Sequence, residues 1–184
     1  MSMKKKVKII IGLILISIIG YLGFSIGKKL KHKKEVAERI QEIPEFSFKD
    51  LNGKLYTRNQ ISAKHPKLFI YFNSDCDFCQ VEGKQIQEHL EELKNVQILF
   101  ISFEEVTGIN SFAEKYHLIN QKNITFLKDY ESKFPEIFEA NTIPFILLYS
   151  KDNQLLRKFK GATKIENIIA HLPTFNADSQ DFYP

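Results

Sequence analysis

Hydrophobic positions along this chain form one long uninterrupted run near the N-terminus and several short runs that alternate with amphipathic stretches. The long run covers residues 9–26, carries no charge and is rich in Ile and Leu. Lysines cluster on both sides of it, within 4–8 and 28–34. As a helix the run rises about 27 Å, which matches the hydrocarbon core of a bilayer. The pattern predicts a single transmembrane helix at 9–26, preceded by a basic region at 1–8.

Two interpretations of this helix remain open, an uncleaved signal anchor and a cleaved signal peptide. Ser25-Ile26-Gly27 is a weak small-x-small cleavage site, and the lysines directly after it favour retention. Because lysines lie on both sides of the run, charge alone does not set its orientation. We therefore predict an uncleaved anchor and take its orientation from the chemistry of the remaining chain.

The chain after the anchor divides into three predicted parts. Residues 27–43 are rich in charge and predict a helical stalk that Pro44 ends. Residues 44–172 carry the short hydrophobic runs and predict one folded domain. Residues 173–184 are polar and predict a flexible tail.

Within the domain, the period of the pattern predicts the secondary structure. The Asn52-Gly53 pair predicts the turn of an N-terminal β-hairpin. Continuous or alternating apolar runs predict strands at 67–72, 96–102, 124–127, 145–149 and 155–160. Spacings of three and four predict helices at 76–94, 109–118, 132–140 (interrupted by Pro135) and 164–172 (capped by Thr163). This alternation predicts an α/β fold, a central mixed β-sheet flanked by helices.

Charge is distributed unevenly along the 184 residues. Nine lysines and no acid lie in residues 1–34, whereas the rest of the chain carries 17 Lys and Arg against 22 Asp and Glu. Nucleic-acid binding needs a basic face on the folded domain, so this balance disfavours it.

The chain has two cysteines, Cys76 and Cys79, separated by Asp77-Phe78. They lie where a predicted buried strand gives way to a predicted helix. Unpaired backbone N–H groups and the helix dipole at that end stabilise a thiolate on Cys76. Cys79 lies one turn further in, where burial is greater. The pattern therefore predicts a redox pair in which Cys76 attacks and Cys79 resolves.

On these motifs, residues 44–172 resemble the thioredoxin superfamily, and specifically its extracytoplasmic TlpA/ResA-like branch. The resemblance rests on the strand KLFIYF, on Asn73-Ser74-Asp75 before the cysteine pair, on Ile143-Pro144 before an apolar strand, and on Gly161. It implies a thioredoxin-like fold and a cis proline at Pro144 that faces the cysteines. The alternative is an ordinary trans proline that starts a strand.

The resemblance also extends to Glu82, because members of this branch often carry a Glu three residues after the second cysteine. Helical spacing places Glu82 on the same face as Cys79, where a partly buried carboxylate exchanges protons with the thiol. The alternative is a solvated acid that complements the helix dipole.

Other positions depart from the family pattern. Asp75 stands where a Trp usually precedes the first cysteine, Asp77-Phe78 replaces a common proline, and Ile70 replaces the buried acid of thioredoxin. The two aspartates place negative charge on both sides of Cys76, which disfavours its thiolate. We therefore expect a reductant rather than a strong oxidant.

The resemblance implies a protein-disulfide oxidoreductase without a cofactor, whose domain lies on the extracytoplasmic (periplasmic) side of the membrane. Its expected partners are disulfide- or thiol-bearing proteins and an upstream membrane electron donor. Two alternatives remain. Peroxide reduction requires a Pro and a Thr or Ser before the reactive cysteine, where this chain has Phe69 and Asn73. Metal handling requires further ligands, but no His or Cys pair completes a zinc site with the two thiolates.

Overall fold

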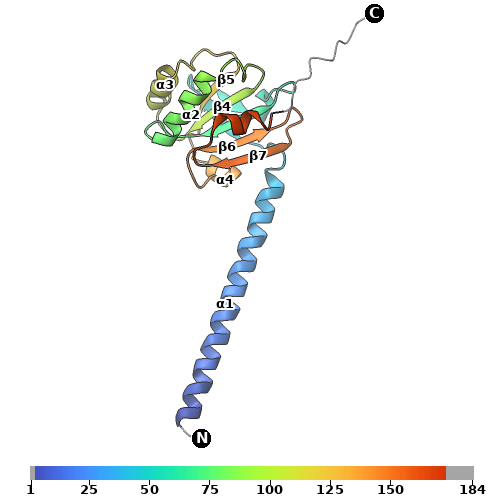
Figure 1. The fold of residues 1–184 in the computed structure, drawn as a ribbon, viewed down its shortest axis with the longest axis vertical. Coiled ribbons are helices and arrows are strands. Elements are labelled where there is room, and N and C mark those ends of the chain that lie inside the picture. The colour runs from blue at the N-terminus through green and yellow to red at the C-terminus, as the bar shows by residue number, and fades with distance from the viewer. Residues whose placement is uncertain (1–2, 173–184) are drawn as a thin grey trace, which may run out of the picture. The chain divides into compact units, whose positions relative to one another are not determined.

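The computed structural model describes residues 3–172, and it describes side chains at residue 12 and from residue 16 onward. Helix α1 (Met3–Arg39) runs without a break through the predicted anchor and most of the predicted stalk (Figure 1). Over the described residues, we find no helix whose length and apolar character suffice to cross a membrane. The side chains of 1–11 and 13–15 and the predicted tail 173–184 lie outside the described residues.

Helix α1 ends at Arg39 rather than at Pro44, and a second compact unit begins at Ile40. Residues 40–43 leave the helix because they pair with the sheet. The N–H of Leu155 donates to the carbonyl of Gln41 at 2.8 Å, and the N–H of Ile43 donates to the carbonyl of Asn153 at 3.2 Å. Backbone groups that are paired in this way are not available for helical hydrogen bonds.

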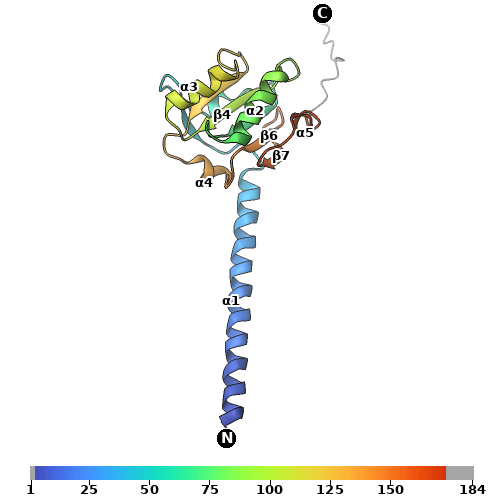
Figure 2. The same ribbon diagram turned by 60° about the vertical axis from the view of Figure 1, so that its left-hand side comes forward.

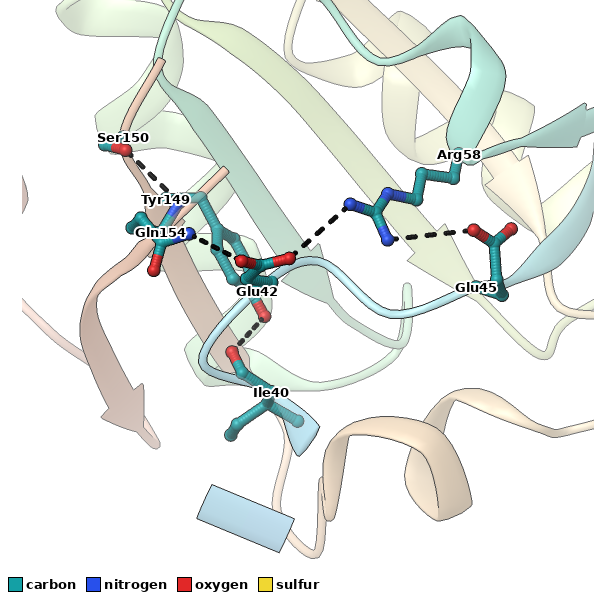
Figure 3. Close-up of polar contacts among 7 residues, drawn as sticks. All are labelled: Ile40, Glu42, Glu45, Arg58, Tyr149, Ser150 and Gln154. Carbon is teal, nitrogen blue, oxygen red and sulfur yellow. Dashed lines mark hydrogen bonds and ion pairs between the residues drawn. The ribbon is translucent and has the colours of Figure 1, made fainter. Parts of the chain in front are cut away.

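Side chains add to this attachment (Figure 3). The Tyr149 hydroxyl donates to the carbonyl of Ile40 at 3.2 Å, and Gln154 donates to the Glu42 carboxylate at 3.1 Å. Arg58 lies within ion-pair distance of Glu42 and of Glu45. Residues 40–45 are therefore part of the domain.

The domain is built on one seven-stranded sheet with the order β2-β1-β5-β4-β3-β6-β7. The strands are β1 (Ser47–Asp50), β2 (Leu55–Thr57), β3 (Lys67–Tyr71), β4 (Gln97–Ser102), β5 (Ile124–Lys128), β6 (Phe145–Tyr149) and β7 (Leu155–Lys160). Strands β3, β4 and β5 are parallel, and the other pairings are antiparallel. The predicted mixed sheet and the hairpin, with Gly53 at a φ of 82°, are confirmed.

Helices cover both faces of this sheet (Figures 1 and 2). They are α2 (Asp77–Glu88), α3 (Val106–Lys115), α4 (Phe134–Phe138) and α5 (Ile165–Ile169), and a 3-10 turn η1 spans Arg58–Gln60. One core cluster joins even-numbered strand residues such as Ile70 and Phe100 to α2, α3 and α5. On the other face Tyr71 stacks on Phe134 of α4, with ring centroids 4.5 Å apart. The alternation of strand side chains thus supplies two apolar layers.

Several predicted helix limits are wrong. Helix α3 spans Val106–Lys115 instead of 109–118, α4 spans Phe134–Phe138 instead of 132–140, and α5 ends at Ile169 instead of residue 172. Helix α2 ends at Glu88 instead of residue 94, because the N–H of His89 donates to the carbonyl of Ile86 at 3.3 Å, three residues back instead of four. Pro135 lies in the first turn of α4 and does not interrupt it, since that position needs no N–H. The N-cap residue of α5 is Lys164, not Thr163, and the Lys164 side chain makes no capping hydrogen bond.

Candidate active site

Cys76 lies at the N-cap of α2, directly after the loop that leaves the carboxyl end of β3. Its N–H donates to the carbonyl of Asn73 at 3.2 Å, which closes a tight turn before the helix. Cys76 is half-buried, whereas Cys79 is fully buried and packs in the core. The predicted difference in accessibility between the two thiols is therefore present in the structure.

A carboxylate that sequence reasoning missed holds this loop. Glu104, just beyond β4, accepts hydrogen bonds from the N–H and the hydroxyl of Ser74, both at 2.7 Å. It also accepts from the hydroxyl of Ser102 at 2.9 Å. Parallel strands β3 and β4 end at the same edge, so an acid after one strand reaches the loop after the other. The only signal in the sequence is this acid at the end of a buried strand.

The Ile143–Pro144 peptide bond is cis, as the resemblance implied. The Cys76 sulfur lies 3.9 Å from the carbonyl oxygen of Ile143, so the segment borders the more accessible thiol. The N–H of Gly161, which has a φ of 78°, donates to the carbonyl of Pro144 at 2.9 Å. The Ile143–Pro144 segment, which is distant in sequence, thus lies beside Cys76.

Glu82 is buried on α2, with 1% of its surface exposed. Neither carboxylate oxygen has a hydrogen-bond partner of ordinary geometry. Burial raises the pKa of this carboxyl from its ordinary 4.5 to about 7, and a polar contact with the backbone of Thr163 offsets part of the rise. The solvated alternative for Glu82 is excluded by this burial.

Burial also dominates the titration of Cys79. It raises the pKa of this thiol to about 12; the backbone of Asn73 opposes the rise, while Cys76 and the charge of Glu82 add to it. Cys79 therefore keeps its proton at neutral pH unless a base removes it. Glu82, one helical turn away on the same face, is a titratable group that interacts with it.

Residues 40–175 match the AhpC/TSA family. The chain belongs to the AhpC/TSA family. A curated relative, a thioredoxin-like protein of Haemophilus influenzae, is 22% identical over 111 residues, which are 60% of this chain and 64% of that protein. The match thus spans less than two thirds of the relative's length.

Solved structures share the fold of this AhpC/TSA-family chain. A secreted Mycobacterium tuberculosis disulfide oxidoreductase homologous to Escherichia coli DsbE superposes with a TM-score of 0.60 at 20% identity, covering 73% of this chain and 96% of that one. The peroxidoxin BcpB of the same organism gives 0.60 at 13% identity, covering 71% and 92%. At these identities the likeness shows a thioredoxin-like fold.

Two positions before Cys76 differ in this AhpC/TSA-family chain from the pattern expected of a peroxide pocket. Phe69 is buried inside β3, and the side-chain oxygen of Asn73 accepts the N–H of Asp75 at 2.9 Å. Neither side chain is the hydroxyl or proline that a peroxide pocket requires. Among the described residues, no group of three or more His, Cys, Asp or Glu side chains is arranged to hold a metal ion.

Proposed function

We propose that this chain is a thiol–disulfide oxidoreductase that reduces disulfides in partner proteins through Cys76 and Cys79. The observation that carries the proposal is the pairing of an accessible thiol at a helix start with a buried thiol one turn further in. The cis Pro144 segment beside Cys76 supports it, because it leaves a backbone edge next to the reacting sulfur.

The first proposed step is attack by the Cys76 thiolate on a disulfide sulfur of the partner. A bond forms between Cys76 and that sulfur, the partner's S–S bond breaks, and the other partner sulfur leaves as a thiolate that takes up a proton. The hydrogen bonds from Ser74 to Glu104 fix the loop that presents Cys76. Cys76, at the helix start, meets the partner without unfolding of the core.

The second step is resolution of the mixed disulfide by Cys79. The Cys79 thiol passes its proton to the Glu82 carboxylate, and its sulfur attacks Cys76. The Cys76–Cys79 disulfide forms, and the second partner sulfur leaves and becomes a thiol. Two electrons and two protons have then moved to the partner.

Each turnover leaves the protein oxidised, so a dithiol donor must restore it. We propose an upstream membrane protein with a cysteine pair, and hence a domain on the extracytoplasmic side. Asp75 and Asp77 are both exposed beside Cys76, and their charge disfavours a strongly oxidising disulfide. The expected direction is therefore reduction of the partner.

We further propose that residues 9–26 anchor the chain in a membrane. The support is the uncharged run of Ile and Leu between lysine clusters. The full chain is expected in the membrane fraction with its N-terminus intact, and deletion of 9–26 is expected to release it. A reporter that functions only outside the cytoplasm, fused after Pro184, should be active. A cytoplasmic signal, or a mature chain that starts near Lys28, would contradict the anchor.

Peroxide reduction is the second candidate, favoured by the likeness to the peroxidoxin BcpB. One experiment separates the two functions. The purified full chain is given insulin with dithiothreitol, and in parallel hydrogen peroxide with the same reductant. The proposal expects accelerated insulin reduction and peroxide consumption no faster than that of a free thiol. Rapid peroxide consumption without insulin reduction would establish the alternative.

A further inference from the structure

One loop reaches both Pro144 and Glu82. Residues 161–164 connect β7 to α5, and the loop bonds to Pro144 through the N–H of Gly161 at 2.9 Å. Two residues later, the backbone of Thr163 contacts the Glu82 carboxylate. The loop therefore lies across the proposed proton acceptor at one end and beside the cis proline at the other.

Gln85 fastens this loop to α2. Its amide nitrogen donates to the carbonyl of Thr163 at 3.1 Å, and its amide oxygen accepts the N–H of Ile165 at 3.0 Å. The two bonds use both ends of one amide, which sets the distance of the loop from the helix. Gln85 follows Glu82 by three residues, so both side chains lie on the same face of α2.

The loop also closes the surface around the acid. Glu82 is 1% exposed although α2 is a surface helix with exposed side chains at Val81 and Lys84. Ile165 and Ile168 of α5 are buried in the same core cluster as Cys79 and Ile86 of α2. A loop without Gln85 loses both of its side-chain bonds to α2 and keeps the Gly161 bond, the bond from Asn167 to Lys164 and the contact of Thr163 with Glu82, which are too few to exclude water from a carboxylate.

We infer that Gln85 is a positioning residue, which holds loop 161–164 over Glu82 and thereby keeps water away from the proton acceptor of the second step. The inference rests on the proposed function for its consequence, because a proton acceptor is useful only if Cys79 exchanges. The shielding of Glu82 from water by the loop does not depend on that function.

The groups around Glu82 decide which way its titration moves when the loop is released. Burial, the larger influence, raises the pKa of Glu82, and the Thr163 contact lowers it. On α2 the thiol of Cys79 interacts with the carboxylate; on the loop and α5 the charged residues Lys164 and Glu166 are exposed. Loss of shielding therefore outweighs loss of the Thr163 contact, and the pKa of Glu82 falls toward 4.5.

The test measures Glu82 directly in the full chain. The side-chain carboxyl of Glu82 is titrated by carbon NMR in the wild type and in Gln85→Met, which keeps the length of the side chain but makes neither bond. Amide hydrogen exchange at Ile165 reports whether the loop has been released. Gln87→Met is the matched control, because Gln87 has no side-chain hydrogen bond within the described part of the chain.

In Gln85→Met we expect faster exchange at Ile165 and a pKa of Glu82 lower by about one unit or more, with both unchanged in Gln87→Met. A purely structural role of Gln85 as a cap of α5 would speed exchange and leave the Glu82 titration in place, which would overturn the inference. Unchanged exchange at Ile165 would overturn it as well.

If Gln85→Met does not fold, Gly161→Ala tests the same loop from its other end. An added Cβ meets no atom within 4 Å there, but the φ of 78° disfavours alanine and loosens the loop. The same fall in the pKa of Glu82 is expected, and its absence would count against the inference. Neither measurement uses disulfide exchange, so an inactive protein would sink the proposed function and leave this result standing.

Discussion

Cys76→Ser is expected to abolish insulin reduction by the full chain, with a loss on the order of 1,000-fold or more. Serine keeps its proton at neutral pH and forms no disulfide, so the first step has no nucleophile. Cys79→Ser is expected to make one attack and then stop, because nothing resolves the mixed disulfide. The measurement is insulin turnover together with non-reducing gel analysis of the trapped adduct.

The two variants should differ in their products as well as their rates. Cys79→Ser should accumulate a covalent adduct through Cys76 that dithiothreitol releases, and Cys76→Ser should accumulate none. The burial of Cys79 is the reason, since its sulfur is inaccessible to a protein disulfide. Adducts that form mainly in Cys76→Ser would reverse the two roles, and wild-type activity in that variant would refute the redox pair.

Glu82→Gln is expected to stabilise the protein above pH 7 and to remove a pH dependence from the second step. In the unfolded chain Glu82 loses its proton near pH 4.5, but in the folded domain only near pH 7. Between these values the folded state binds more protons, so the free energy of unfolding falls as pH rises. The fall attributable to Glu82 is about 3 kcal/mol in total, complete above pH 7.

A neutral glutamine has no such titration, so the difference between the two proteins isolates this group from all others. Urea unfolding at pH 4.5 and at pH 8 measures this difference. The free energy of unfolding of the variant should rise relative to that of the wild type as pH rises. Glu88→Gln is the matched control: Glu88 is exposed on the same helix and pairs with Lys84 at 3.7 Å. It should follow the wild-type curve.

Resolution kinetics provide the second readout. In the wild type the rate of resolution should rise through about pH 7 as Glu82 ionises, and this inflection should be absent in Glu82→Gln. Parallel stability curves for the two proteins, with the same kinetic inflection, would mean that folding does not raise the pKa of Glu82 and that Glu82 has no part in the reaction.

Several features were decided by local sequence alone. Apolar runs at 67–72 and 96–102 form the buried strands β3 and β4. A central strand that is covered on both faces needs apolar side chains on both, and a continuous apolar run supplies them. The Asn52-Gly53 pair became the hairpin turn, since Gly53 adopts a positive φ at no steric cost. The position of Cys76 at a helix start followed from the change of period after residue 75. Each signal lies within a few residues of the feature it predicts.

Tertiary structure decided what depends on distant partners. The sequence left Glu82 equally open to burial and to solvation, because the loop that covers it lies about 80 residues further on, where Gln85 bonds to Thr163 and Ile165. Helix α1 stopped short of Pro44 because residues 40–43 found backbone partners on the sheet. Glu104 bonds to the loop before Cys76 because the parallel strands β3 and β4 end at the same edge of the sheet. A local pattern fixes which residues form an element, whereas the solvation of a side chain depends on which other elements pack over it.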